Sequence, residues 1–231
     1  MAPTTTLLFD YGGTLDDDGR PWLDRFEPLW RAAGAAQPHE TLVRAFYDAD
    51  DNLAKLHDLS TLGLEETVRL QCADAGKVLL PGNDQAARQV ADRFTADCRA
   101  ALKKNRPLLQ RLAARYKLGI VSNFYGNLEA ILRSEGLLEL FDAVADSAKV
   151  GREKPDPAIF NWALERLKAK PEEALMVGDS LKRDMAGAEA AGIPHAWLAG
   201  DKAEARACCP GTPVLRSFAD LEPLLLGVPA R

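Results

Sequence analysis

From about residue 105 to the C-terminus, short apolar stretches alternate with stretches of helical periodicity, and this alternation constrains the fold most. The expected strands are 118–122, 143–145, 174–177, 195–198 and 213–215, and the expected helices are 108–116, 128–135, 158–168, 185–191 and 218–226. Strands that alternate with helices form a parallel sheet with helices on both faces. One more apolar strand, at 5–10, stands apart from this region.

The stretch between these two parts, residues 20–104, has helical periodicity throughout. It predicts roughly four helices and no strand, with helix starts at Pro38 and at Asn83 or Asp84. The simplest arrangement is a helical insertion that covers the sheet edge where the first strand ends. The sequence therefore predicts an α/β fold: a doubly wound parallel sheet as a core of residues 1–19 and 105–231, with a helical cap of residues 20–104.

Composition narrows the class of protein. The chain has 231 residues, 47% of them hydrophobic, which suffices for a large core. A net charge of −5, with no basic run beyond Lys103-Lys104, argues against nucleic-acid binding. No apolar run approaches the ~20 residues that span a membrane, and a secretory segment is not expected, so we expect a cytoplasmic protein without a membrane partner. The sequence carries no signal for an oligomeric state.

The four cysteines have neither CxxC spacing nor histidines at metal-site intervals. We expect thiols that are buried or inert, with Cys208 and Cys209 partly exposed in a polar stretch.

Asp10 is the first candidate for chemistry. It ends the apolar run Leu7-Leu8-Phe9 and enters a glycine-rich turn, Tyr11-Gly12-Gly13-Thr14. Such a position presents a carboxylate at the C-terminal edge of a parallel sheet, where open α/β folds carry their sites.

Three further segments follow predicted strands and meet the same edge. Ser122-Asn123 offers a hydroxyl and backbone N–H groups to an anionic oxygen, although it is also typical of a turn. Lys154 precedes Pro155, so its backbone is restricted and its ammonium suits a phosphoryl group, while Asp156 is typical of a helix cap. Asp179 and Asp184 offer the hard oxygens that Mg²⁺ requires, although this segment alone is also typical of a capped helix start.

In this order the four segments resemble the four motifs of the haloacid dehalogenase superfamily, and the resemblance covers essentially the whole chain. It implies a Rossmann-like core, a helical cap and, as in most relatives, a Mg²⁺-dependent phosphatase acting through an aspartyl-phosphate. The expected substrate is a small phosphorylated metabolite. The roles that the resemblance implies are catalysis for Asp10 (the nucleophile) and Lys154, phosphate binding for Thr14, Ser122, Asn123 and Lys154, and metal binding for Asp10, the Gly12 carbonyl, Asp179 and Asp184.

The chain departs from this pattern at Gly12, where phosphatases of the superfamily carry an aspartate as the general acid and base. Glycine keeps the backbone carbonyl and loses a function typically worth ~10²–10⁴-fold in rate. Asp16, Asp17 and Asp18 could substitute, although a run of three acids is more typical of a solvated turn. The candidates in the cap are Asp48, Asp50, Asp51 and His57.

Other reactions stay open because of this departure. A dehalogenase-like attack on carbon needs no acid at position 12, but it also needs no metal, and the acid pair Asp179 and Asp184 argues against it. A phosphonatase-like C–P cleavage requires a cap lysine for a Schiff base; Lys55 is the candidate, although it is more typical of a surface lysine. A catalytically impaired binding module is the third alternative.

The aromatic residues Tyr11, Phe124 and Tyr125 could line a substrate subsite.

Overall fold

The computed structural model describes residues 3–202 and 211–227 and contains a six-stranded sheet whose paired strands are all parallel. The strand order is β3-β2-β1-β4-β5-β6. The strands are β1 (Thr6–Phe9), β2 (Lys117–Ser122), β3 (Ala143–Asp146), β4 (Ala174–Gly178), β5 (His195–Leu198) and β6 (Val214–Leu215). Each predicted strand is present, and the doubly wound α/β fold is confirmed. In this order the connections reverse direction beside β1, and the crevice at such a point is where open sheets bind ligands.

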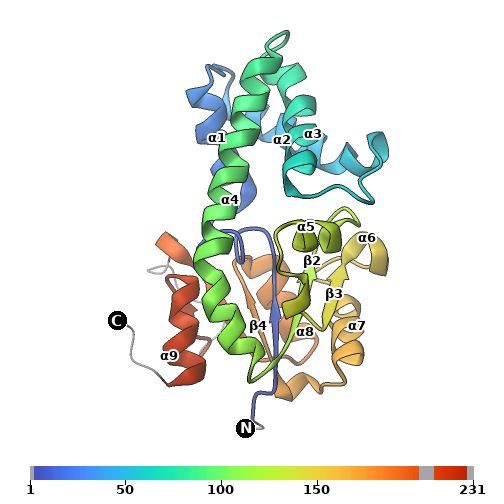
Figure 1. Ribbon diagram of the computed structural model, residues 1–231, viewed down its shortest axis with the longest axis vertical. Helices are drawn as coiled ribbons and strands as arrows, with labels where there is room; N and C mark the ends of the chain where they lie inside the picture. Colours follow the sequence, from blue (N-terminus) through green and yellow to red (C-terminus); the bar gives the residue numbers. More distant parts are fainter. Residues whose placement is uncertain (1–2, 203–210, 228–231) are drawn as a thin grey trace.

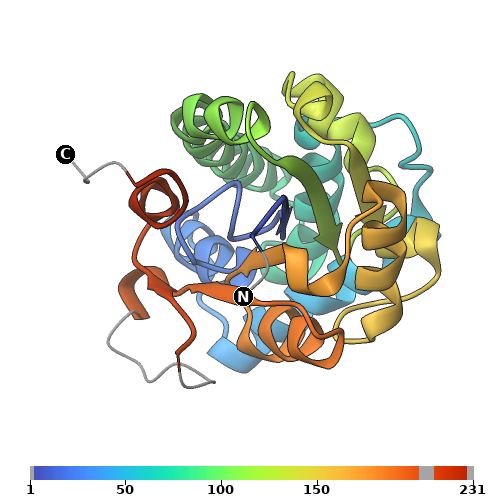
Figure 2. The same ribbon diagram turned by 90° about the horizontal axis from the view of Figure 1, so that it is seen from below.

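Helices cover both faces of the sheet, because the side chains of a strand alternate between its faces. In β1, Leu7 and Phe9 join a cluster with α4, α5 and α9, whereas Leu8 joins a second cluster with α7 and α8. Figure 2 shows the strands between these two groups of helices. The helices are α5 (Leu128–Ser134), α6 (Ser147–Val150), α7 (Pro157–Leu167), α8 (Ala186–Ala190) and α9 (Leu221–Leu226), besides the four described next.

Four helices follow β1, as predicted: α1 (Trp22–Ala32), α2 (His39–Leu56), α3 (Leu64–Leu79) and α4 (Asp84–Ala113). We call α1–α3 and the α4 residues up to 104 the helical block. The predicted starts are correct: Pro38 precedes α2, and the side chain of Asn83 accepts a hydrogen bond from the Ala86 N–H at the start of α4. In Figure 1 the block lies beyond the sheet at the carboxyl ends of the strands, and α4 runs from the block down to the sheet.

The prediction of a separate helix at 108–116 is wrong, because α4 continues through Pro107 to Ala113. A proline inside a helix costs about 3 kcal/mol. Here the α4 side chains Leu102, before Pro107, and Leu108, after it, are buried. The Asn105 amide also donates to the Leu15 carbonyl at 3.0 Å. Tertiary packing therefore keeps the helix continuous through the proline. The division into a core and a cap stays a prediction, and its boundary at 104/105 falls inside α4.

Two other helices differ from their predicted form. The segment predicted as 185–191 begins with a π-helical turn at Leu181–Met185 before α8, and the segment predicted as 218–226 begins with a 3₁₀ turn at Phe218–Asp220 before α9. None of the helices in the described ranges is long and apolar enough to cross a membrane. Cys72 and Cys98 are buried free thiols, as expected, and Cys208 and Cys209 lie outside the described residues.

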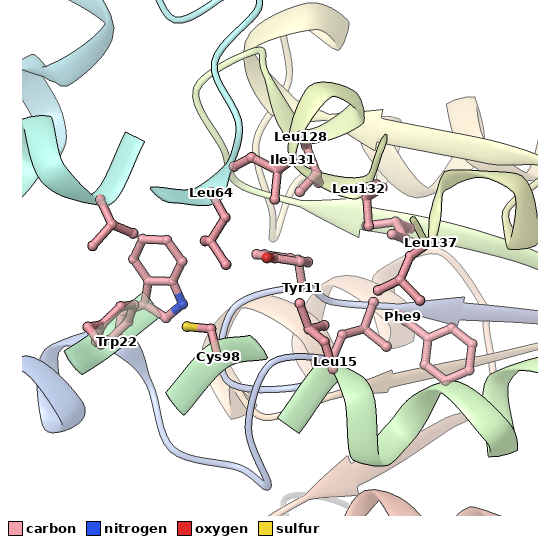
Figure 3. Close-up of a cluster of buried hydrophobic side chains, with 14 of the residues drawn as sticks. Phe9, Tyr11, Leu15, Trp22, Leu64, Cys98, Leu128, Ile131, Leu132 and Leu137 are labelled. Carbon is pink, nitrogen blue, oxygen red and sulfur yellow. The ribbon is translucent and has the colours of Figure 1, made fainter. Parts of the chain in front are cut away.

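The core continues from the sheet into the helical block. Figure 3 shows Tyr11, from the turn after β1, with Leu64 of α3 and Ile131 of α5 on one side of its ring and Leu15 on the other. All four side chains are fully buried. This packing fixes the turn that follows Asp10 against both parts of the molecule.

Candidate active site

Asp10 lies at the carboxyl end of β1, between β2 and β4. Its backbone N–H donates to the Val177 carbonyl of β4 at 3.0 Å, which continues the sheet ladder by one residue. Its Oδ1 accepts a hydrogen bond from the Ser122 hydroxyl at 2.7 Å and lies 2.8 Å from the Lys154 ammonium. Both contacts involve Oδ1, and Oδ2 accepts no hydrogen bond from the described residues.

Lys154 is held by its backbone. The Asn123 side chain donates to the Lys154 carbonyl at 3.1 Å and accepts from the Lys154 N–H at 2.7 Å. Asp156 accepts from the Ala158 N–H at 2.9 Å and caps α7, so the helix-cap interpretation is also correct. The lysine side chain is buried. Burial alone would lower its pKa, but the carboxylates of Asp10 and Asp184 outweigh burial and raise it, so the ammonium stays charged.

Asp10, Asp179 and Asp184 form a compact acidic cluster, with one carboxylate oxygen of each within 4.8 Å of the others. Asp184 is fully buried and accepts hydrogen bonds from the Lys154 ammonium at 2.6 Å and the Ser180 N–H at 2.9 Å. Burial raises the pKa of Asp184 to about 6, and the nearby carboxylate of Asp10 adds to this effect. Burial, Asp10 and Asp184 also raise the pKa of Asp179 well above its usual value.

These three acids fit a divalent cation. Their ligand atoms are hard oxygens, which Mg²⁺ prefers. Lys154 supplies one positive charge against three carboxylates. Burial first, and then repulsion from the neighbouring carboxylates, raises the pKa values of Asp179 and Asp184, and a bound cation would relieve that repulsion.

Thr14 lies behind this cluster rather than at its surface. It is fully buried, and its hydroxyl donates to Asp179 Oδ1 at 3.2 Å. It does not line the cavity described below. Its predicted role in phosphate binding stays a prediction, and its observed contact orients Asp179.

Gly12 borders the cavity, and the indole of Trp22 covers the position where a side chain would begin. A Cβ on Gly12 would lie 3.1 Å from Trp22 Nε1 and 3.4 Å from its Cδ1. The indole N–H is itself engaged, since it donates to Asp16 Oδ2 at 2.8 Å. Sequence reasoning missed Trp22, because nothing in the local pattern links it to a glycine ten positions earlier.

The expectation of a solvated turn at 16–18 is wrong for Asp16 and Asp17, which are buried. Asp16 accepts from the Gly13 N–H at 2.6 Å and pairs with Arg25 at 3.0 Å, and Arg25 also pairs with Asp17 at 3.1 Å. Asp18 is half-buried and lies 2.6 Å from the Lys104 ammonium. All three acids are occupied in holding the turn and do not line the cavity, so they do not replace the missing acid.

A cavity of about 610 Å³ lies between the sheet edge and the helical block. The core contributes Asp10, Gly12, Ser122, Asn123, Phe124, Tyr125, Lys154, Asp179, Lys182, Arg183 and Trp197 among others, and the side of the helical block contributes Trp22, Leu23, Phe46, Tyr47 and Asp50. Phe124 and Tyr125 line it, as expected, whereas Tyr11 is fully buried and does not. Phe46, Tyr47 and Arg183 were missed, because their spacing on helices predicts packing or a solvated face.

Of the four predicted substitutes on α2 and just after it, Asp50 alone lines the cavity. Asp48 and Asp51 are exposed, and His57 pairs with Asp74 at 2.8 Å. Lys55 is exposed, donates to Asn52 at 3.2 Å and lies outside the cavity lining, which removes the candidate for a Schiff base.

Comparison with known proteins identifies the class. Residues 4–192 match the family of haloacid dehalogenase-like hydrolases, so the chain belongs to this family of hydrolases.

Individual relatives agree with this assignment. Haloacid dehalogenase-like hydrolase domain-containing protein 3 of Mus musculus is 32% identical over 237 residues, covering 95% of this chain and 92% of the mouse protein. Pyrimidine 5'-nucleotidase YjjG of Escherichia coli is 34% identical over 121 residues, about half of each chain (51% and 53%). The crystal structure of a dehalogenase with an intermediate complex superposes with a TM-score of 0.65 over 97% of this chain and 98% of its own, at 19% identity, and supports the fold.

Proposed function

We propose that this protein is a Mg²⁺-dependent phosphatase of small phosphorylated metabolites and that Asp10 is its nucleophile. The observation that carries the proposal is the environment of Asp10. One carboxylate oxygen is held by Ser122 and Lys154, the other accepts no hydrogen bond from the described residues, and Asp179 and Asp184 lie close by. A phosphatase relative, the nucleotidase YjjG, supports the same class of reaction.

In the proposed reaction, the free Oδ2 of Asp10 attacks phosphorus in line and forms an aspartyl-phosphate, which water then hydrolyses. Lys154 and the Ser122 hydroxyl fix the carboxylate through Oδ1, so that Oδ2 points in one direction. The Lys154 ammonium also neutralises charge that develops on the transferred group. Asn123 keeps this ammonium in place by its paired hydrogen bonds to the Lys154 backbone.

The residues that would hold Mg²⁺ are Asp10, Asp179, Asp184 and the backbone carbonyl of Gly12. When bound, the ion supplies Lewis-acid stabilisation of the phosphoryl oxygens. The chain's own contribution is to keep its acids in place: Thr14 and the Trp197 indole hold Asp179 (3.2 Å to its side chain, 2.9 Å to its carbonyl), and Ser180 and Lys154 hold Asp184.

The alternatives that the sequence left open receive less support. A dehalogenase-like reaction leaves the half-buried Asp179 and the buried Asp184 without a purpose, and burying unused carboxylates is unfavourable. The phosphonatase-like reaction requires a lysine from the helical block, and none of the described lysines of that block lines the cavity; Lys154, Lys182 and Lys202, which do, come from outside it. A binding module requires no nucleophile.

The test is turnover of a panel of phosphate monoesters with Mg²⁺ and with EDTA, for the wild type and for Asp10→Asn. We expect turnover that requires Mg²⁺ and that Asp10→Asn abolishes. Asp48→Asn, which changes an exposed acid on α2, is the matched control and keeps full activity. Turnover by Asp10→Asn at a rate comparable to the wild type would overturn the proposal, and ligand binding without any turnover would favour the binding module.

A further inference from the structure

Asp50 occupies a position in the cavity that no role described so far explains. It lies on α2, is half-buried and lines the same cavity as Asp10. Among the described residues of the helical block, it is the one acid that lines this cavity. It is thus an acidic group that the helical block contributes to the cavity of the nucleophile.

Two hydrogen bonds fix Asp50 and use only one of its oxygens. Its Oδ1 accepts from the Gln71 amide at 3.0 Å and from the Tyr125 hydroxyl. Tyr125 follows Ser122, the residue that holds Asp10, by three positions, so Asp50 is tied directly to the loop that carries the nucleophile's partner. The second oxygen, Oδ2, has no hydrogen bond from the described part of the chain and is free to contact a ligand.

In-line displacement places the leaving oxygen on the side of phosphorus opposite to the attacking carboxylate. With Asp10 at the sheet edge, this oxygen therefore points away from the sheet, toward the helical block. An acid at position 12 would have approached the leaving oxygen from the turn after β1. Asp50 approaches it from α2 instead.

We propose that Asp50 is the proton donor that replaces the acid missing at Gly12; this inference rests on the proposed phosphatase function. As the P–O bond breaks, the proton on Asp50 Oδ2 passes to the leaving oxygen and an alcohol departs, while Asp10 Oδ2 forms the new bond to phosphorus. Water then attacks the aspartyl-phosphate and gives one proton to the Asp50 carboxylate. The Asp10–phosphorus bond breaks, phosphate leaves, and both acids return to their starting forms.

The electrostatic surroundings agree with this role. Burial raises the pKa of Asp50, and the adjacent carboxylate of Asp51 adds to the effect. The hydroxyl of Tyr125, the guanidinium of Arg183 and the amide of Gln71 act in the opposite direction without cancelling it. Asp50 therefore keeps its proton to a higher pH than a free aspartate, as a general acid requires.

Other groups that line the cavity are less suited to donate. Burial and the nearby Asp50 raise the pKa of Tyr125 well above its usual value, and its hydroxyl already donates to Asp50. The Trp22 N–H donates to Asp16, and Asp179 belongs to the acidic cluster around Asp10.

The test compares two substrates of similar shape whose leaving groups differ in basicity. Benzyl phosphate releases an alkoxide, which needs a proton, whereas p-nitrophenyl phosphate releases a stable phenoxide. The value of kcat/KM reports on the steps up to the aspartyl-phosphate, where the leaving group departs. We expect Asp50→Asn to lower kcat/KM for benzyl phosphate by about 10²–10⁴-fold and to change that for p-nitrophenyl phosphate far less. Asp48→Asn, at an exposed acid of the same helix that does not line the cavity, is the control and leaves the ratio of the two values unchanged.

The pH profile gives a second readout. For the wild type, kcat/KM for benzyl phosphate falls as pH rises through the pKa of Asp50, because the proton is lost; Asp50→Asn removes this dependence. An equal loss on both substrates would assign Asp50 a structural role and overturn the inference while the phosphatase stands. A wild type that hydrolyses only p-nitrophenyl phosphate would overturn it as well. Inactivity of the wild type on both substrates would instead end the proposed phosphatase, and this inference with it.

Discussion

The contact between Gly12 and Trp22 predicts a specific coupling in stability. The perturbation is Gly12→Ala, introduced into the wild type and into Trp22→Ala. The backbone at Gly12 does not have a positive φ, so alanine fits its conformation and would by itself stabilise the protein by about 0.4–1 kcal/mol, through the unfolded state. The new Cβ, however, lies 3.1 Å from Trp22 Nε1 and 3.4 Å from Cδ1, closer than ordinary packing allows.

Overpacking of this kind costs about 1–3 kcal/mol. The two crowding atoms belong to the indole ring, and a truncation to alanine removes both of them. In the wild type we therefore expect Gly12→Ala to be neutral or destabilising by up to about 2.5 kcal/mol, the overpacking less the gain in the unfolded state. In Trp22→Ala it is stabilising, and the coupling between the two sites is about 1–3 kcal/mol.

The assay is urea unfolding of the four proteins of this double-mutant cycle, with equal m-values as a check that the unfolding transition is unchanged. Trp22→Ala on its own destabilises by about 3–5 kcal/mol, because it removes a buried indole together with the N–H that donates to the carboxylate of Asp16. The cycle subtracts this loss. A coupling below about 0.5 kcal/mol would refute the reasoning, because the indole would then not limit the space at Gly12.

Two further predictions concern the acidic cluster. Mg²⁺ at about 100 times its dissociation constant stabilises the fold by about 2.7 kcal/mol; we expect a rise in Tm by calorimetry that Asp179→Asn removes, and an unchanged Tm in the wild type would argue against the metal site. Gly178→Ala places a Cβ on the carboxylate of Asp184, so it should displace that carboxylate and abolish both turnover and the Mg²⁺-induced rise in Tm. Gly82→Ala, at a glycine with open space around it but a φ of +79°, costs stability through backbone strain and leaves Mg²⁺ binding unchanged, which is measured by calorimetric titration.

The strands could be predicted from the sequence, because fully buried parallel strands are short apolar runs between helices. Asp10, Ser122, Lys154 and Asp179 could be predicted for the same reason, since each stands where a predicted strand ends or shortly after, and parallel strands end at one edge. The structure does bring these four residues together at that edge.

The surroundings of Gly12 could not be predicted in this way. They depend on tertiary contacts between segments that no local pattern connects, such as Arg25 of α1 with Cys98 of α4 at 2.9 Å. The same limit explains the wrong expectation for Asp16. A run of acids is typical of solvated turns, and only the packing of α1 and α4 against it creates a buried pairing site. The continuation of α4 through Pro107 is a third case, in which burial overrides a local helix breaker.

The indole over Gly12 also limits how this lineage can change. Glycine and aspartate codons can differ by a single base, so the usual acid is one mutation away in genetic terms. In the folded protein the step is larger, because the new side chain would crowd Trp22, whose N–H is committed to Asp16. An aspartate at position 12 would therefore require Trp22 to shift, which is itself unfavourable while Asp16 stays buried. The glycine at position 12 is thus held in place by its packed neighbours, and selection for a better proton donor would act on other positions of the cavity wall.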